Sequence, residues 1–284
     1  MMLSDNKKNN IIKMYLYLLI PFIIYGIYKN GYLLYEDNLI SIIDVFKPLY
    51  LVLISIFITL LIDLMIKRKI SLSFNLLNMI MYSLIVSPRI NYLLFIVLVI
   101  LFNIFYRIFK DKISVNYVCL FFLITYFINI LLKVNFLNSA EILYNYNLSI
   151  LDILLGRNIG GICSTSIILS LIAFLILKES IYYKKNIPII INAVYLFLSL
   201  IYYLIANDSS LFLNSSIIFA SIFISSLPKY SPYSKKGISL SSIFIGLFTF
   251  IVSIFAPNIA IYLTTFIVSI FSKKLDNLEL NKKN

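Results

Sequence analysis

The residues with the clearest chemical potential gather in a short segment near the middle of the chain. From Leu154 to Ser166 the sequence reads LLGRNIGGICSTS, which holds three of the seven glycines and a run of three hydroxyl side chains. Glycines let a ligand approach the backbone closely, and the amide groups at a helix start attract anions. The segment predicts a site for an anionic or flavin-type ligand that uses Gly160, Gly161, Ser164 and Thr165. A tight turn into the next helix is the alternative interpretation.

The chain has two cysteines and no histidine. It therefore lacks the ligands that a haem or a four-cysteine iron–sulfur cluster needs, and it has no Ser-His-Asp or Cys-His constellation. We expect no metal site and no self-contained catalytic site, and whether the chain contributes to an enzyme stays open. Any redox cofactor would be organic and held by backbone and hydroxyl groups.

Other polar residues lie inside apolar stretches. Asp63 falls near the end of one such stretch, where a carboxylate is costly and often functional, but Lys67 follows at i+4 and favours a structural ion pair. Six asparagines could line an ion path, although hydrogen bonds between helices are the commoner role. These asparagines are Asn75, Asn78, Asn103, Asn129, Asn192 and Asn214.

The elements that position these residues are apolar. Hydrophobic residues make up 61% of the chain and charged residues 13%, against roughly 25% charged residues in soluble domains. A helix needs about 20 apolar residues to cross a bilayer, and ten stretches approach that length. They cover residues 11–29, 48–66, 70–87, 90–109, 113–132, 162–177, 187–206, 211–227, 237–256 and 258–272.

The distribution of the basic residues tests this count. With the N-terminus inside, nineteen of the 24 lysines and arginines fall in the tails and the inner loops. Five fall outside, namely Lys29, Lys47, Arg89, Lys133 and Arg157. Such alternation is what the positive-inside rule requires of ten helices, so we expect a multi-pass protein of the cell membrane with both termini in the cytoplasm.

The predicted loops divide the chain into a cytoplasmic tail (1–10), a first five-helix half (11–132), an outer loop (133–161), a second five-helix half (162–272) and a second cytoplasmic tail (273–284). Because five is odd, the two halves have opposite orientations. The sequence thus predicts an all-α integral membrane protein in two inverted halves, in which ligands usually bind at the midplane.

The net charge of +12 does not predict nucleic-acid binding. The basic residues form short clusters at helix ends rather than one basic face, and such clusters contact anionic lipid heads. We expect the lipid bilayer as a partner and no nucleic acid.

Several segments along the chain match one family in order and spacing. The segments are Leu19-Ile20-Pro21, Tyr25-Gly26-Ile27-Tyr28, Leu84 to Arg89, Gly156 to Gly161 with Thr165-Ser166, Ile187-Pro188, Phe223 to Pro232, and Lys235-Lys236-Gly237. Through them the chain resembles the D-type membrane protein of the Rnf electron-transport complex and the related B-type membrane protein of the sodium-translocating NADH:quinone reductase. The order and spacing of the segments carry the resemblance more than any one motif does.

The resemblance implies a membrane subunit of an ion-coupled electron-transport complex, with other membrane subunits as partners and flavin mononucleotide (FMN) or riboflavin as cofactor. The family attaches FMN through a threonine in the outer central loop. The best match here is Ser139 to Leu143, with Glu141 in place of the threonine, so we expect any flavin to be bound non-covalently. Two further family positions also differ, because the Glu before Thr165 is missing and Leu227 replaces an Asp.

These departures keep two alternatives open. Inverted halves around a midplane cavity also suit a transporter of small solutes or ions. A membrane anchor without redox function is the third interpretation. The coupling ion and the electron donor and acceptor do not follow from the sequence.

Overall fold

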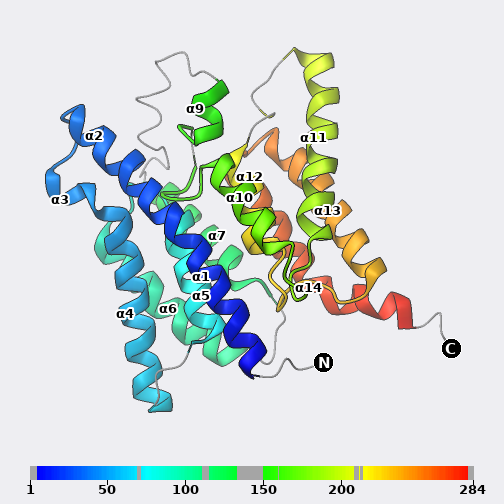
Figure 1. Cartoon of the computed structure of the whole chain (residues 1–284), viewed down its shortest axis with the longest axis horizontal. Helices are drawn as coiled ribbons and strands as arrows, with labels where there is room; N and C mark the ends of the chain where they lie inside the picture. The colour runs from blue at the N-terminus through cyan, green and yellow to red at the C-terminus, as the bar shows by residue number, and fades with distance from the viewer. Residues whose placement is uncertain are drawn as a thin grey trace. The chain divides into compact units, whose positions relative to one another are not determined.

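The computed structural model describes residues 5–68, 72–110, 115–132, 150–158, 160–207, 211 and 214–280. Every regular element in these residues is helical (Figure 1), which confirms the predicted all-α class. The elements are α1 (Asp5–Ile27), the π-helix η1 (Tyr28–Tyr32), α2 (Leu33–Glu36), α3 (Ile42–Val45), α4 (Lys47–Lys67), α5 (Phe74–Ile85), α6 (Tyr92–Phe109), α7 (Tyr117–Leu131), α9 (Ile150–Leu155), α10 (Ile167–Leu177), α11 (Asn186–Ala206), α12 (Ser215–Ala220), the π-helix η2 (Ser221–Ser225), α13 (Lys235–Ser253) and α14 (Ala260–Leu280).

Several helices are long and apolar enough to cross a membrane, which indicates a multi-pass membrane protein. In the described residues these are Asn9–Glu36, Lys47–Ile66, Tyr92–Phe109, Asn186–Ala206 and Lys235–Ser253. Each of the other five predicted stretches contains a shorter apolar helix. These shorter helices are Phe74–Ile85, Tyr117–Leu131, Ile167–Leu177, Ser215–Ser225 and Ala260–Ser272.

The polarity of α4 is the reverse of that of a surface helix in a soluble protein. Ser55, Thr59 and Asp63, spaced four residues apart on one face, are buried. Large apolar side chains point outward instead, with Leu53 50% and Phe57 66% exposed. A helix that hides its polar face and exposes its apolar face is stable in lipid, so α4 supports membrane insertion.

The chain forms two compact units. Unit 1 comprises Met1–Phe109 and Ile124–Leu169, and unit 2 comprises Lys110–Leu123 and Ser170–Asn284. The chain passes from one unit to the other after Phe109 at the end of α6, again within α7 and a third time within α10. The inverted relation between the two predicted five-helix halves stays a prediction.

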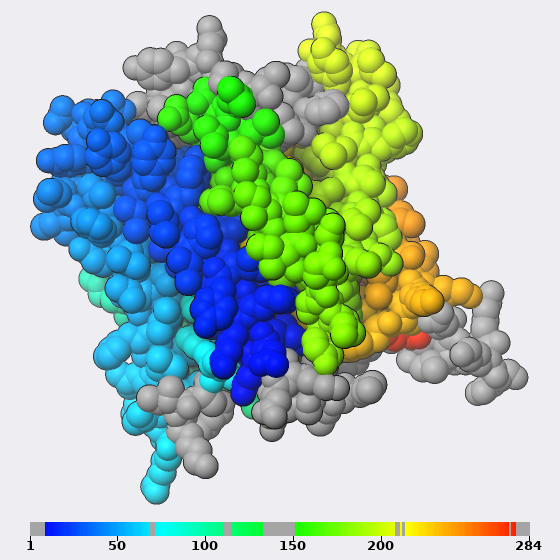
Figure 2. Space-filling view, in the orientation of Figure 1, coloured from blue at the N-terminus to red at the C-terminus, as the bar shows by residue number. Residues whose placement is uncertain are grey.

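In unit 1, α1 and α4 lie side by side (Figure 2). Polar side chains join α4 to other helices of this unit. The Asn75 amide donates to Asn103 Oδ1 (2.7 Å), and the Asn103 amide donates to Thr59 Oγ1 (3.2 Å), which links α5, α6 and α4. For these two asparagines the structure confirms the role between helices. Asp63 pairs with Arg107 of α6 at 2.6 Å, whereas the predicted pair with Lys67 involves a side chain outside the described ones and stays a prediction.

Small and hydroxyl residues join the helices of unit 2. A Cβ atom on Gly246 of α13 would lie 3.0 Å from the Ile191 carbonyl oxygen, so glycine lets α13 approach α11 closely. Thr249 of α13 and Thr264 of α14 share a hydrogen bond of 2.8 Å between their hydroxyl groups. The packing of this unit is therefore also that of membrane helices.

Three predicted boundaries are corrected. The first helical run continues through η1 and α2 to Glu36, so Lys29 lies inside a helical segment and not in an outer loop. Residues 160–166 are not helical, and the sixth predicted helix begins only at Ile167. The last helix, α14, extends to Leu280 into the predicted tail.

Candidate functional site

The candidate site lies in unit 1, at a π-helical turn in the first helical run. This turn, η1, buries Lys29, Asn30 and Gly31. A π-turn inserts a residue into the helical repeat and changes the directions of neighbouring side chains, and such turns occur frequently at functional sites. Gly31 has the backbone of Val45 directly against it, so a larger residue would push α3 away.

The glycine-rich segment lies along the end of α5. The amide of Ile162 donates to the carbonyl of Val86, and the amide of Cys163 donates to the carbonyl of Leu84, both at 2.9 Å. A Cβ atom on Gly161 would meet the backbone of Ile85. Glycine at 161 therefore permits contact between two backbones of the same chain.

The start of the glycine-rich segment depends on a second glycine. Gly156 has a φ of +104°, in the region that only glycine adopts readily. It ends α9 and lies against the backbone of Thr165 and Ser166. The chain thus folds back on itself between α9 and α10.

Lys29 and Asn30 hold this folded segment. The Lys29 ammonium donates to the carbonyl of Asn158 (2.6 Å) and to the hydroxyl of Thr165 (3.0 Å). The Asn30 amide donates to the carbonyl of Ile162 (2.5 Å). We name these five residues (Lys29, Asn30, Asn158, Ile162 and Thr165) the Lys29 cluster.

Lys29 is fully buried within a candidate membrane span. Its two acceptors are neutral, and no carboxylate pairs with it in the part of the chain that the structure describes. A cation in that position is costly to bury, and inside a membrane it most often marks a pathway or a ligand site. The Lys29 cluster can therefore attract an anion or exchange a proton.

The six residues predicted for a cofactor divide into two groups. Gly160, Gly161, Ser164 and Thr165 are buried in the segment that the Lys29 cluster holds. Ser139 and Glu141 lie outside the described residues. Sequence reasoning missed Lys29, Asn30 and Asn158, although a lysine next to an apolar run that resumes at Leu33 was a usable signal.

The described atoms of this segment do not form a flavin cradle by themselves. The amides of Ile162 and Cys163 donate to carbonyl groups at the end of α5, and the Thr165 hydroxyl accepts a hydrogen bond from Lys29. The hydroxyl of Ser164 is buried without a hydrogen-bond partner among the described residues. Among the described residues predicted for the cofactor, Ser164 therefore has a hydroxyl without a partner that could meet a ligand, and cofactor binding stays a prediction.

The described residues contain no group of three His, Cys, Asp or Glu side chains that could hold a metal ion. Cys119 and Cys163 are both buried as free thiols. Cys163 lies against Gly26 of α1, which places a third segment of the chain beside the glycine-rich one.

Unit 2 has a polar cluster of its own at the loop before α13. The Lys184 ammonium donates to the carbonyls of Ser231 and Pro232 and to the Ser231 hydroxyl, each at 2.8 Å, and it lies 3.9 Å from the centre of the Tyr233 ring. Burial lowers the pKa of Lys184 to about 8, against the attraction of Asp276. Asp276 in turn accepts from the amides of Tyr233 (2.8 Å) and Ser234 (2.9 Å), which fixes the loop onto α14.

Comparison with protein-family models finds no match for this chain, and no curated protein matches it significantly.

Proposed function

We propose that this chain is a ten-span membrane subunit of an Rnf-like, ion-coupled electron-transport complex. In this proposal both termini face the cytoplasm, and the five shorter apolar helices cross or enter the membrane together with the five long ones. The chain holds no catalytic constellation of its own, so its function depends on partner subunits that supply and accept electrons.

The observation that carries the proposal is that the segments resembling the family meet within each unit. In unit 1 the Tyr25–Tyr28 segment places Gly26 against Cys163, and the glycine-rich segment is hydrogen-bonded to Leu84 and Val86. These three segments are separated by more than 50 residues each along the sequence, yet they form one packed site.

The same holds in unit 2. Ile187 lines one small cavity together with Ser231 and Pro232 of the Phe223–Pro232 segment, and a Cβ atom on Gly237 would lie 3.0 Å from the Pro232 side chain. Segments that resemble one family and also meet in the fold support the proposal, because chance matches would have no reason to lie together.

Flavin in this proposal is FMN or riboflavin bound non-covalently. Ser164 is the described residue that could contribute a hydroxyl, and Ser139 and Glu141 complete the set that the resemblance implies. A redox role would then require a neighbouring subunit to close the site.

The proposal is tested by purifying the tagged chain from its native membrane in mild detergent. We expect other membrane subunits and flavin-carrying subunits in a fixed ratio to the chain, and electron transfer through the purified complex to an acceptor dye. Loss of this activity on Lys29→Met, with the complex still assembled, would support a role of the site in the reaction. A chain that purifies alone and adds no electron transfer to its membrane contradicts the proposal.

One observation favours a second function. A buried lysine without a carboxylate partner in the described residues suits a transporter that binds an anionic solute near the midplane. In that case the purified chain alone, in proteoliposomes, would take up a small organic anion, and Lys29→Met would abolish the uptake. Uptake without partner subunits separates this function from the first.

A further inference from the structure

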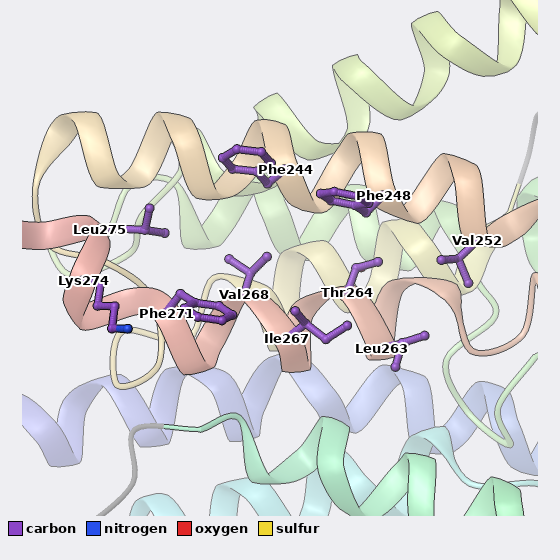
Figure 3. Close-up of a pocket in the computed structure, with 10 residues that line it drawn as sticks. All are labelled: Phe244, Phe248, Val252, Leu263, Thr264, Ile267, Val268, Phe271, Lys274 and Leu275. Atoms are coloured by element: carbon purple, nitrogen blue, oxygen red, sulfur yellow. The ribbon is translucent and has the colours of Figure 1, made fainter. Parts of the chain in front are cut away.

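An apolar groove of about 460 Å³ lies between α13 and α14 in unit 2 (Figure 3). Phe244 and Phe248 of α13 line one side, and Leu263, Ile267 and Phe271 of α14 line the other. Phe244, Phe248, Ile267 and Phe271 are each between 44% and 47% exposed, so the groove opens to the surroundings of the chain.

The walls of this groove present hydrocarbon. Thr264 is its one lining residue with a hydroxyl group. That hydroxyl is bonded to Thr249 (2.8 Å) and to the carbonyl of Ala260 (3.0 Å), so it is satisfied within the two helices. The groove therefore offers no unpaired polar group to an occupant along its length.

One charged side chain, Lys274, lines the groove, and Figure 3 shows it at one end. Lys274 is exposed, and its Nζ lies 5.8 Å from the centre of the Phe271 ring. From Leu263 to Lys274 the helix rises about 16 Å at 1.5 Å per residue, which is about half the hydrocarbon thickness of a bilayer. The groove thus matches one leaflet, with its cation at one end.

We propose that this groove binds one phospholipid with an anionic head group, its acyl chain between the phenylalanines and its phosphate at Lys274. The predicted topology puts Lys274 at the cytoplasmic face, where anionic lipids are concentrated. A helix of another protein could fill the apolar part, but it would leave Lys274, the charged residue among the described lining residues, without an anionic partner. The inference rests on membrane insertion and not on the proposed electron-transport function.

The test is native mass spectrometry of the delipidated full chain after addition of phosphatidylglycerol or of phosphatidylcholine with the same acyl chains. We expect the chain to bind phosphatidylglycerol about five-fold more tightly, since one lysine near a lipid surface contributes on that scale. Lys274→Gln should remove this preference and keep the weaker binding of phosphatidylcholine. Val268→Trp, which fills the groove, should weaken the binding of both lipids.

Two matched variants serve as controls. Lys178→Gln changes a lysine just after α10 whose side chain is 40% exposed, and Ile270→Trp places a tryptophan on a face of α14 that does not line the groove. Both should bind the two lipids as the unaltered chain does. A preference for phosphatidylglycerol that survives Lys274→Gln, or that falls equally with Lys178→Gln, would overturn the proposal. So would a dimer that Val268→Trp dissociates without any change in lipid binding, because the groove would then hold a second copy of the chain.

Discussion

Lys29 Nζ lies 3.0 Å from Thr165 Oγ1, although 136 residues separate the two along the chain. The contact ties the first helical run to the glycine-rich segment that precedes α10. A buried ammonium thus has a hydroxyl and a backbone carbonyl as its acceptors in the described structure.

This relationship predicts a non-additive pair of substitutions. Thr165→Val removes an acceptor from a buried charge, so the free energy of unfolding should fall by about 1–3 kcal/mol. In the double variant Lys29→Met, Thr165→Val, the charge that needed the acceptor is gone, and stability should return toward that of the unaltered chain.

Melting can be followed with a thiol-reactive dye, because Cys119 and Cys163 are buried in the folded chain. Stability losses that simply add in the double variant would show that Lys29 and Thr165 do not interact as described.

Asp63 and Arg107 give a second prediction. Asp63 is 1% and Arg107 16% exposed, and Arg107→Gln removes the positive charge that pairs with the buried carboxylate at 2.6 Å. The free energy of unfolding should fall by about 3 kcal/mol, and Lys67→Gln should change it far less. Equal losses in the two variants would contradict this prediction and would show that Lys67 stabilises Asp63 as much as Arg107 does.

The pH dependence of stability should report on Lys184. Its pKa is about 8 in the folded chain and near the ordinary 10.5 in the unfolded one. Between these values the unfolded state binds more protons, so this group makes the folded state more stable as the pH rises from about 8 to 10.5. That contribution is complete above the unfolded value and is lost as the pH falls through 8.

In Lys184→Met this contribution disappears. As the pH rises from 8 to 10, the melting temperature of the unaltered chain should therefore rise relative to that of Lys184→Met. The melting temperature of Lys178→Met should depend on pH as that of the unaltered chain does. A constant difference across that range would mean that burial does not lower the pKa of Lys184.

The apolar helices could be predicted from the sequence because hydrophobic runs of near-membrane length leave few other structures open. The buried position of Lys29 could not be predicted from the sequence. A lysine after Gly26 at the end of an apolar run resembles a loop residue, and only the π-turn and the acceptors at Asn158 and Thr165 bring it inside.

The predicted start of the sixth helix was wrong for a related reason. Residues 162 and 163 are apolar enough to continue a helix, but their amides pair with the end of α5, and this depends on contacts more than 70 residues away. By contrast, Asn75 and Asn103 took the expected role between helices because an amide buried in an apolar bundle needs a partner.

The chain should carry no covalent flavin. In the proposed resemblance Glu141 takes the place of the attachment threonine, and a carboxylate cannot form the same phosphoester linkage. Denaturing electrophoresis of the purified protein under ultraviolet light should show no fluorescent band. A band that survives denaturation would mean that another hydroxyl carries the flavin, and Thr165→Val would be the first variant to examine.

The membrane topology underlies both the proposed function and the lipid groove, and one labelling measurement tests it directly. Single cysteines replace Asn138 in the predicted outer loop and Lys235 at the exposed start of α13, while Cys119 and Cys163 are buried. An impermeant thiol reagent on intact cells should label the cysteine at 138 and should label the one at 235 only after the cells are opened. Labelling at 235 in intact cells would contradict ten spans with both termini in the cytoplasm.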